Sequence, residues 1–214
     1  METMTRKPFQ GVFNILRFNW HFYVLALALL TLLFVLQFFA SYSVSSFLFI
    51  FILLIAFASM SSLLVSFYVY DCSNLYCLNW LDFLNIHSNS KLVTVNAGFD
   101  ETSFLLHQKF PDSTLSVFDF YDASKHTEVS IARARKTQEV YPGTEIINTS
   151  LIPLKDNYVD FAFAIFSVHE IRNTEERILF FRQLRRILNT NGKIVVVEHL
   201  RDLPNFIAYN FGLY

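Results

Sequence analysis

The stretch TEERILFFRQLRRILNTNGKIVVVE, residues 174–198, joins a helical pattern to a strand pattern with a short polar interval between them. Apolar residues recur on one face of the first part and charged residues lie elsewhere, which predicts an amphipathic helix over Thr174–Leu188. Asn173 or Thr174 can cap its start, and Asn191-Gly192 is expected to end it. The apolar run that follows predicts a strand.

Similar strand-type and helix-type runs alternate upstream of this stretch. The predicted strands are Leu92–Asn96, Leu115–Asp119, Glu145–Asn148, Val159–Phe166 and Lys193–Glu198. The predicted helices are Glu101–Phe110, Lys125–Gln138 and Thr174–Leu188. This alternation predicts an α/β fold in which a parallel sheet is covered by helices.

The first third of the chain is different, because residues 18–70 contain no Lys, Arg, Asp or Glu. The chain is 53% hydrophobic with 25 Phe, and this uncharged run carries the excess. The polar stretch Ser41–Ser46 divides it into two apolar runs, about 22–40 and 47–70, each long enough to span a bilayer as a helix. The sequence therefore predicts a transmembrane helical hairpin.

Positive charges before the first span set the expected orientation. Arg6, Lys7 and Arg17 precede it, whereas the connecting turn is uncharged, so both chain ends are expected in the cytoplasm. A cleaved signal peptide is the alternative for the first run, but the second run would still hold the chain in the membrane. We thus expect a two-pass membrane protein.

The domain organisation follows from these patterns. Residues 1–70 form the N-terminal segment and anchor, 71–90 a junctional helical segment, and 91–214 the α/β domain. The net charge is −1 with no basic face, so no nucleic-acid partner is expected. Cys72 and Cys77 are not spaced as a zinc or redox pair, and no metal site is predicted.

Three segments of the α/β domain resemble the class I S-adenosylmethionine-dependent methyltransferases, of the type 11-like group. IPLKDNYVDF, residues 152–161, is similar to the family's LPFPDNSFD segment, and FSVHEI, residues 166–171, is similar to its LHHI strand end. RRILNTNGKIVVVE, residues 185–198, is similar to RVLKPGGRLVIVE. The resemblance runs from about Leu92 to Arg201 and implies a Rossmann-like sheet in the order 3-2-1-4-5.

The family's glycine-rich run is altered in this chain. The corresponding residues are TVNAGFD, 94–100, in which Gly98 remains, Thr94 replaces the usual acid, and Asn96 and Asp100 take outer glycine positions. Asn and Asp are the non-glycine residues that best tolerate the positive φ of such positions. Asp100 would repel a diphosphate, so NAD is disfavoured and S-adenosylmethionine, a cation, is the expected cofactor.

The resemblance also implies a set of cofactor-binding residues. Asp119 ends the second predicted strand as an exposed carboxylate where the family's acid binds the ribose hydroxyls, with Asp122 as runner-up; a turn acid that caps the next helix is the alternative. Asn148 lies where the family often has an acidic residue near the adenine ring, although an Asn with only a structural role in the loop is an equally good interpretation. The implied cofactor site consists of Asn96, Ala97, Gly98, Asp119, Phe120, Asn148 and Thr149.

His169 and Glu170 follow the fourth predicted strand and are the candidate catalytic residues, with His169 as base or acceptor-positioning group. Glu198 and His199 follow the fifth strand, and there a polar pair satisfied by neighbouring backbone is the preferred interpretation. The implied function is a membrane-anchored methyltransferase acting on a lipid-like or other membrane-associated small molecule. A non-catalytic, membrane-tethered binding module on a decayed methyltransferase fold is the alternative, and a purely structural membrane protein ranks third.

The predicted sheet lacks the two closing strands that the family usually has after the fifth. Only Leu200–Tyr214 remains, in which Asp202–Phe211 can form a helix with Pro204 in its first turn. The expectation is either a truncated C-terminus or a sheet edge covered by the membrane or a partner. Neither the oligomeric state nor the methyl acceptor follows from the sequence.

Overall fold

The computed structural model describes residues 6–137 and 139–199. Contacts divide them into two compact units, a helical unit over residues 6–73 and an α/β unit over residues 74–199. The expected helix within Asp202–Phe211 lies outside the described residues.

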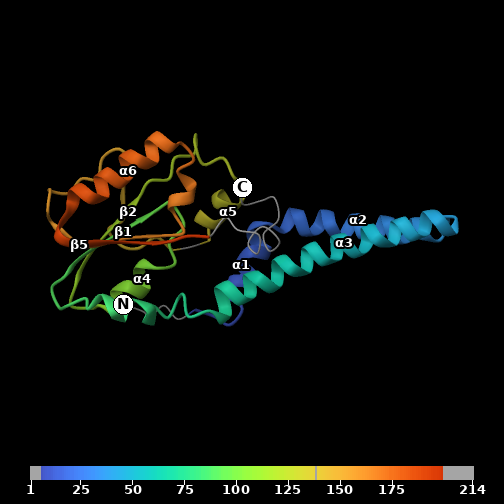
Figure 1. Cartoon of the computed structure of the whole chain (residues 1–214), viewed down its shortest axis with the longest axis horizontal. Coiled ribbons are helices and arrows are strands. Elements are labelled where there is room, and N and C mark those ends of the chain that lie inside the picture. Colours follow the sequence, from blue (N-terminus) through green and yellow to red (C-terminus); the bar gives the residue numbers. More distant parts are fainter. Residues whose placement is uncertain (1–5, 138, 200–214) are drawn as a thin grey trace. The chain divides into compact units, whose positions relative to one another are not determined.

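The helical unit is built from three α-helices, α1 (Gln10–Phe18), α2 (Trp20–Gln37) and α3 (Tyr42–Phe67). Helices α2 and α3 lie side by side as an antiparallel hairpin (Figure 1). In the described residues, these two are long and apolar enough to cross a membrane, α3 together with its continuation to Cys72. At 1.5 Å per residue they are about 27 Å and about 39 Å long, against a hydrocarbon core of about 30 Å.

The expected turn at Ser41–Ser46 is wrong in its extent, because α3 already begins at Tyr42. Ser45 donates its backbone N–H to the Ser41 carbonyl at 2.8 Å, and the Ser46 hydroxyl donates to the Tyr42 carbonyl at 3.1 Å. Serine hydroxyls that bond back one helical turn are satisfied within the helix, so polarity alone did not mark a loop here.

Helix α1 is fixed to the end of α3 by a partly buried carboxylate contact. Asp71 lies in the π-helical turn Tyr68–Cys72 that continues α3, and its two oxygens accept from the backbone nitrogens of Gly11 and Val12 at 2.8 and 2.9 Å. An anion is favourable at a helix N-terminus. A Cβ on Gly11 would lie 2.3 Å from that of Tyr70, so only glycine allows this approach.

The predicted junctional helical segment is reduced to one short element. The structure has a 3₁₀ helix at Asn79–Leu84, entered through Leu78 and left through Asn85, both with positive φ. Its leucines are buried against the α/β unit, where they pack with Leu92, Leu106 and Phe163. The segment therefore belongs to the core of the α/β unit.

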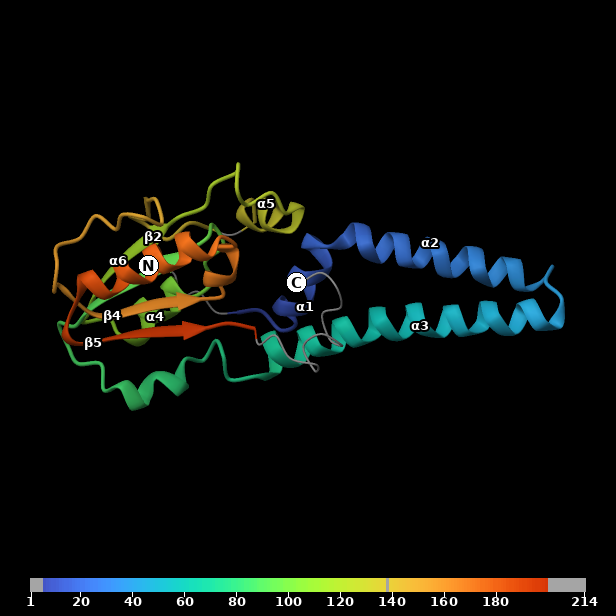
Figure 2. The ribbon, with the colours of Figure 1, turned by 45° about the horizontal axis from the view of Figure 1, so that its top comes forward.

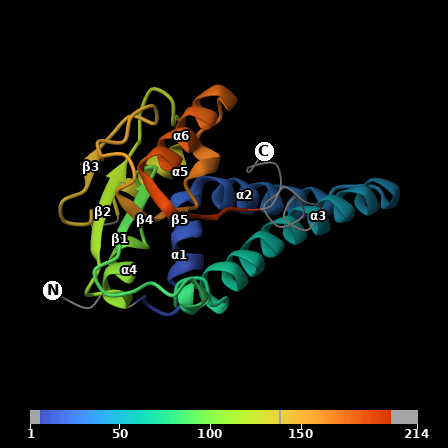
Figure 3. The same cartoon turned by 60° about the vertical axis from the view of Figure 1, so that its left-hand side comes forward.

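The sheet of the α/β unit has five parallel strands in the order β3-β2-β1-β4-β5 (Figure 3), which confirms the predicted fold. The strands are β1 (Lys91–Asn96), β2 (Thr114–Asp119), β3 (Glu145–Ile146), β4 (Val159–Ile165) and β5 (Leu188–Val197). All were predicted to within two residues except the start of β5.

Helices cover both faces of this sheet. Helix α4 (Ser103–Lys109) lies on one face and α6 (Thr174–Ile187) on the other (Figure 1). Along β1, Val93 and Val95 face the α6 side, whereas Leu92 faces the α4 side. A central parallel strand that is buried on both faces reads as a nearly continuous apolar run, as β1 does.

Helix α5 (Val129–Arg135) is shorter than the predicted Lys125–Gln138. The residues before it form a turn in which Asp122 accepts from the Ser124 backbone at 2.8 Å and donates its own N–H to His126 Nδ1 at 2.8 Å. These local side-chain contacts compete with helix formation. Helix α5 lies beyond the carboxyl ends of the strands (Figure 2).

Helix α6 begins as predicted, with Asn173 accepting from the Glu176 backbone at 3.0 Å. The helix does not extend to Asn191-Gly192, because β5 already begins at Leu188. The register of β5 against β4 shifts between Val159 and Phe161. A Cβ on Gly192 would lie 3.0 Å from the Val159 carbonyl oxygen and 2.8 Å from Leu188 Cδ2. Gly192 therefore serves close packing within an irregular strand rather than a helix end.

Arg186 of α6 holds the 152–161 segment in place. Its guanidinium donates to the carbonyls of Ile152 and Leu154, both at 2.7 Å, and to the Asp156 carboxylate at 2.6 Å. Two of the segments that carry the family resemblance are thus in direct contact. The charged donor satisfies carbonyl groups of a loop that forms no regular structure of its own.

Replacement of Arg186 by Ala is expected to destabilise the α/β unit by about 2–4 kcal/mol, because two carbonyls and a carboxylate lose a charged donor. Chemical denaturation of the full-length protein in detergent micelles measures the change. Arg182→Ala on the exposed side of the same helix is the matched control and is expected to change stability by less than about 0.5 kcal/mol. Equal effects of the two substitutions would contradict the proposal that Arg186 stabilises the 152–161 segment.

Candidate functional site

The loop after β1 contains the altered glycine run. Asn96 is 7% exposed, and its Oδ1 accepts from the Gly98 backbone N–H at 2.9 Å, while Gly98 has a φ of +88°. Neither Asn96 nor Asp100 has a positive φ. The expectation that both replace glycines by tolerating positive φ is wrong, because Asn96 instead closes the turn through its side chain.

The residues that flank this loop carry side-chain hydrogen bonds. Thr94, which stands in place of the family's acid, bonds Ser103 between their hydroxyls at 2.6 Å, and both are buried. Asp100 Oδ1 accepts from the backbone nitrogens of Thr102 and Ser103, each at 2.9 Å, where α4 begins. Asp100 therefore caps a helix with one oxygen and keeps the other for a different partner.

Two polar atoms beside this loop are buried without a hydrogen bond within the part of the chain that the structure describes. They are Asn96 Nδ2, a donor, and Asp100 Oδ2, an acceptor. A buried polar atom without a partner costs about 1–3 kcal/mol, so such atoms mark places where a ligand restores the missing bond. The pair fits a ligand that offers both a carboxylate and an ammonium group, as the methionine end of S-adenosylmethionine does.

Asp119 ends β2 beside this loop and is the register partner of Asn96. It is 8% exposed, so the expectation of an exposed carboxylate is wrong. Its Oδ1 accepts from the Tyr121 backbone at 2.8 Å, and its Oδ2 pairs with Arg135 Nη1 at 2.6 Å. Asp122, the runner-up, is exposed and bonds Ser124 within its own turn, which lowers its pKa.

Arg135, the last residue of α5, was not predicted as part of the site. Its guanidinium pairs with Asp119 and lies 4.1 Å above the centre of the Tyr121 ring. A Cβ built on Gly98 would be 2.0 Å from Arg135 Nη1. Three of the residues around the β1 and β2 ends thus contact one cation.

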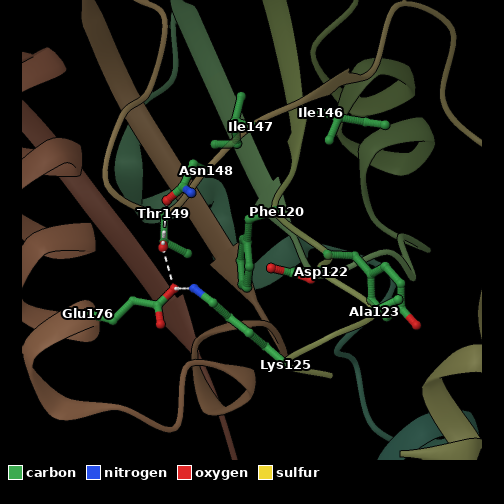
Figure 4. Close-up of a pocket in the computed structure, with 10 residues that line it drawn as sticks. Phe120, Asp122, Ala123, Lys125, Ile146, Ile147, Asn148, Thr149 and Glu176 are labelled. Atoms are coloured by element: carbon green, nitrogen blue, oxygen red, sulfur yellow. Dashed lines mark hydrogen bonds and ion pairs between the residues drawn. The ribbon is translucent and has the colours of Figure 1, made fainter. Parts of the chain in front are cut away.

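A cavity of about 320 Å³ opens at the carboxyl ends of β2 and β3 (Figure 4). Its lining includes Phe120, Asp122, Lys125, Asn148, Thr149 and Glu176. Phe120 is buried and packs on Phe180 of α6, which gives the cavity an apolar wall. The structure therefore brings Phe120, Asn148 and Thr149, three of the expected cofactor-binding residues, together around one cavity.

The polar side of the cavity converges on Glu176, which the sequence did not single out. Lys125 Nζ lies 2.8 Å from Glu176 Oε1, and the Thr149 hydroxyl donates to the same oxygen (Figure 4). Burial raises the pKa of Glu176, but the hydrogen bonds from Lys125 and Thr149 outweigh this and keep the pKa below its usual value. Asn148 Oδ1 accepts from the Ser150 backbone at 3.0 Å.

The residues after β4 form the other side of the candidate site. Phe166 has a φ of +50°, which is strained for an aromatic residue, and its ring stacks on His199 at 4.5 Å. The Ser167 hydroxyl donates to the Val95 carbonyl at 2.9 Å, which ties this end of β4 to β1. The 3₁₀ turn Val168–Glu170 then carries the two candidate catalytic residues.

Glu198 orients His169. Its Oε1 accepts from the Val168 backbone at 2.6 Å, and its Oε2 lies 2.7 Å from His169 Nδ1. Backbone groups therefore satisfy one oxygen of Glu198, whereas its other oxygen contacts the side chain of His169. Glu170 Oε1 lies 3.4 Å from His169 Nε2, so the imidazole stands between two carboxylates.

The carboxylates decide the charge of His169. Burial lowers the pKa of His169, but the hydrogen bonds and negative charges of Glu170 and Glu198 outweigh it and raise the pKa to about 10. His169 is thus an imidazolium at neutral pH and donates hydrogen bonds rather than accepting a proton. Burial and the charge of His169 lower the pKa of His199 to about 4, so this second ring is neutral.

Comparison with known proteins finds one family whose sequence model matches part of the α/β unit. Residues 118–196, from the end of β2 to the end of β5, match the sequence model of a family described as "Methyltransferase domain". This part of the α/β unit is thus similar in sequence to a methyltransferase domain, and its sheet order is Rossmann-like. No curated protein matches the chain.

Several solved structures are similar to the chain at low identity. The YcgJ protein of Bacillus subtilis is 13% identical, over 63% of this chain and 55% of its own, with a TM-score of 0.44. A methyltransferase of Aquifex aeolicus is 20% identical, over 62% and 71%, with a TM-score of 0.40. The phosphoethanolamine N-methyltransferase 2 of Haemonchus contortus, solved with phosphomonomethylethanolamine and S-adenosylhomocysteine, is 14% identical, over 57% and 27%, with a TM-score of 0.40. The chain spans little more than half of the first of these and about a quarter of the last.

The charge of His169 predicts how the stability of the α/β unit depends on pH. The folded-state pKa of about 10 lies above the ordinary 6.5, so the stabilisation is complete below pH 6.5 and is lost as pH rises toward 10. Thermal unfolding of the full-length protein in detergent micelles, followed between these pH values, is expected to show this fall. The His169→Gln substitution should reduce the fall in stability with pH, whereas His87→Gln at an exposed position should leave this fall unchanged. A fall of the same size in His169→Gln would contradict the assignment.

Proposed function

We propose that this protein is a membrane-anchored S-adenosylmethionine-dependent methyltransferase. The observation that carries the proposal is the pair of buried, unpartnered atoms, Asn96 Nδ2 and Asp100 Oδ2, at the β1 end of a methyltransferase fold. The ammonium and carboxylate of the cofactor's methionine end would satisfy both. Gly98 lies between them in the chain and allows the ligand to approach the backbone together with Ala97.

The remaining cofactor contacts follow the strand ends. Asp119 would accept from the ribose hydroxyls, and Phe120 would pack on the adenine ring in the cavity of Figure 4. Asn148 commits its Oδ1 to the loop, so its amide nitrogen is the group to donate to an adenine ring nitrogen. Thr149 holds Glu176 at the polar side of the same cavity.

When bound, S-adenosylmethionine supplies an electrophilic methyl group, which passes to the acceptor as its bond to sulfur breaks. The chain must hold the acceptor in line with that methyl and remove any proton that the acceptor loses. His169, as an imidazolium, would orient the acceptor by donating the N–H of Nε2, an atom that lies 3.4 Å from Glu170 Oε1 in the absence of an acceptor. Burial raises the pKa of Glu170, but the hydrogen bond and charge of His169 outweigh it and keep the pKa below its usual value, so Glu170 is the ionised group that would take up the proton.

The helical hairpin supports a membrane location for the reaction. Helices α2 and α3 expose large apolar side chains along their length, including Leu25, Leu27, Phe47 and Phe57. A charge-free hairpin with this surface is suited to lipid. We therefore propose that the acceptor is a lipid-like or other small molecule that partitions into the bilayer, with both chain ends in the cytoplasm.

A non-catalytic, membrane-tethered module on the same fold is the second candidate. It is favoured by the contact of Arg135 with Gly98 and Asp119, two residues that cofactor binding needs. The two functions differ in whether methyl transfer to any acceptor occurs after cofactor binding. Transfer of labelled methyl from S-adenosylmethionine to extracted membrane lipids separates them.

Asp119→Asn is expected to weaken S-adenosylmethionine binding by about 10- to 150-fold, because a hydrogen bond to a charged group contributes about 1.5–3 kcal/mol. The asparagine keeps the acceptor for the Tyr121 backbone, so the fold should remain intact. Calorimetric titration of the full-length protein in detergent micelles measures the loss. Asp122→Asn is the matched control and should bind as the unmodified protein does. A loss of affinity confined to Asp122→Asn would assign ribose binding to Asp122. Absence of binding by the folded unmodified protein would refute the proposed function.

The orientation can be tested with the two cysteines of the chain, Cys72 and Cys77, which are both exposed. A membrane-impermeant maleimide is expected to leave them unlabelled in intact cells and to label them after permeabilisation, because the positive residues before α2 stay in the cytoplasm. The variant Cys72→Ser/Cys77→Ser/Ser43→Cys should show the opposite pattern. Labelling of the native cysteines from outside would reverse the orientation.

A further inference from the structure

Arg135 is held at the end of α5 by residues from two strand ends. The guanidinium is 2.6 Å from Asp119 Oδ2 and lies over the Tyr121 ring, and its Nη1 occupies the space beside Gly98 that a side chain there would need. The Arg135 side chain is 32% exposed and that of Asp119 is 11% exposed. This partly buried ion pair is less screened by solvent than a surface pair.

The open space of the site is limited to one side of this contact. The cavity reaches from Phe120 to Asn148 and Glu176, and neither Gly98 nor Asp119 is part of its lining. The space for a flat ring is thus open, whereas the adjoining space between the β1 loop and Asp119 is filled by the guanidinium. A nucleoside that enters the cavity therefore meets Arg135 where its ribose must go.

We propose that Arg135 is a built-in competitor for the ribose position, so that the cofactor must displace it from Asp119 and Gly98 before it binds. The inference rests on the proposed function, because the ribose of S-adenosylmethionine is the group that takes its place. Displacement needs only the side chain to turn outward, because Arg135 is the last residue of a seven-residue helix and is already one-third exposed. The strength of the Arg135–Asp119 pair then sets the apparent affinity for the cofactor.

The size of the effect follows from the occupancy of the blocked state. If Arg135 fills the position about nine-tenths of the time, the apparent affinity is reduced about tenfold. Arg135→Ala is therefore expected to bind S-adenosylmethionine about tenfold more tightly than the unmodified protein. Arg133→Ala, one charge removed from the last turn of the same helix, is the matched control and should leave the affinity unchanged.

The experiment is a calorimetric titration of full-length protein in detergent micelles with S-adenosylmethionine. A second readout is salt: raising NaCl from about 0.05 M to about 0.5 M should tighten binding to the unmodified protein by weakening the internal ion pair, and this gain should vanish in Arg135→Ala. Asp119→Asn should also cost more affinity in the Arg135→Ala background, because there it no longer releases a competitor.

The outcomes separate the inference from the function on which it rests. Tighter binding by Arg135→Ala, with the salt effect abolished, supports the competitor. Binding by the unmodified protein with equal or weaker binding by a folded Arg135→Ala variant overturns it and leaves the proposed function standing, since Arg135 would then bind the cofactor or serve the fold. Absence of binding by both folded proteins overturns the function and the inference together.

Discussion

The central strand β1 is paired on both sides, with β2 through the whole strand and with β4 through Leu92–Thr94, and the candidate site depends on this arrangement. The strand order reverses here, because β2 and β4 leave β1 in opposite directions along the sheet. Asn96 and Asp119 are consequently register partners, and Ser167 bonds the carbonyl of Val95 from the other side. Strand pairing and the Ser167 side chain thus bring residues separated by some seventy positions in sequence to one edge of the sheet.

Much of the sheet and its helices could be predicted because short local sequence patterns determine these elements. The strands β1, β2 and β4 are apolar runs bounded by polar turns, and the start of α6 carries its own cap in Asn173. The order of the strands came from the resemblance of short segments, and the contact of Arg186 with the 152–161 loop gives two of those segments a shared physical role. The α/β fold is confirmed, while the proposed binding residues remain predictions.

The remaining features depend on contacts between distant residues and leave no local mark. The sequence around Arg135 does not distinguish it from other charged residues at helix ends, because its contacts with Asp119 and Gly98 form only in the folded domain. His169 was expected to serve as a base or to position the acceptor, and the charges of Glu170 and Glu198, which keep it protonated, favour the second role. The Asn191-Gly192 pair resembles a helix stop, yet the pairing of Leu188 with Val159 begins the strand before it. Tertiary contacts override local preference in each case.

The position of β1 also bears on how the chain folds during synthesis. About sixty residues separate the end of β1 from the start of β4, so at roughly 5–20 residues per second one edge of β1 waits several seconds for its partner. During that interval the nascent half-sheet presents the unpaired backbone of an almost wholly buried strand, which is a template for aggregation. The yield of the α/β unit is therefore expected to depend on how well this edge of β1 is protected during synthesis.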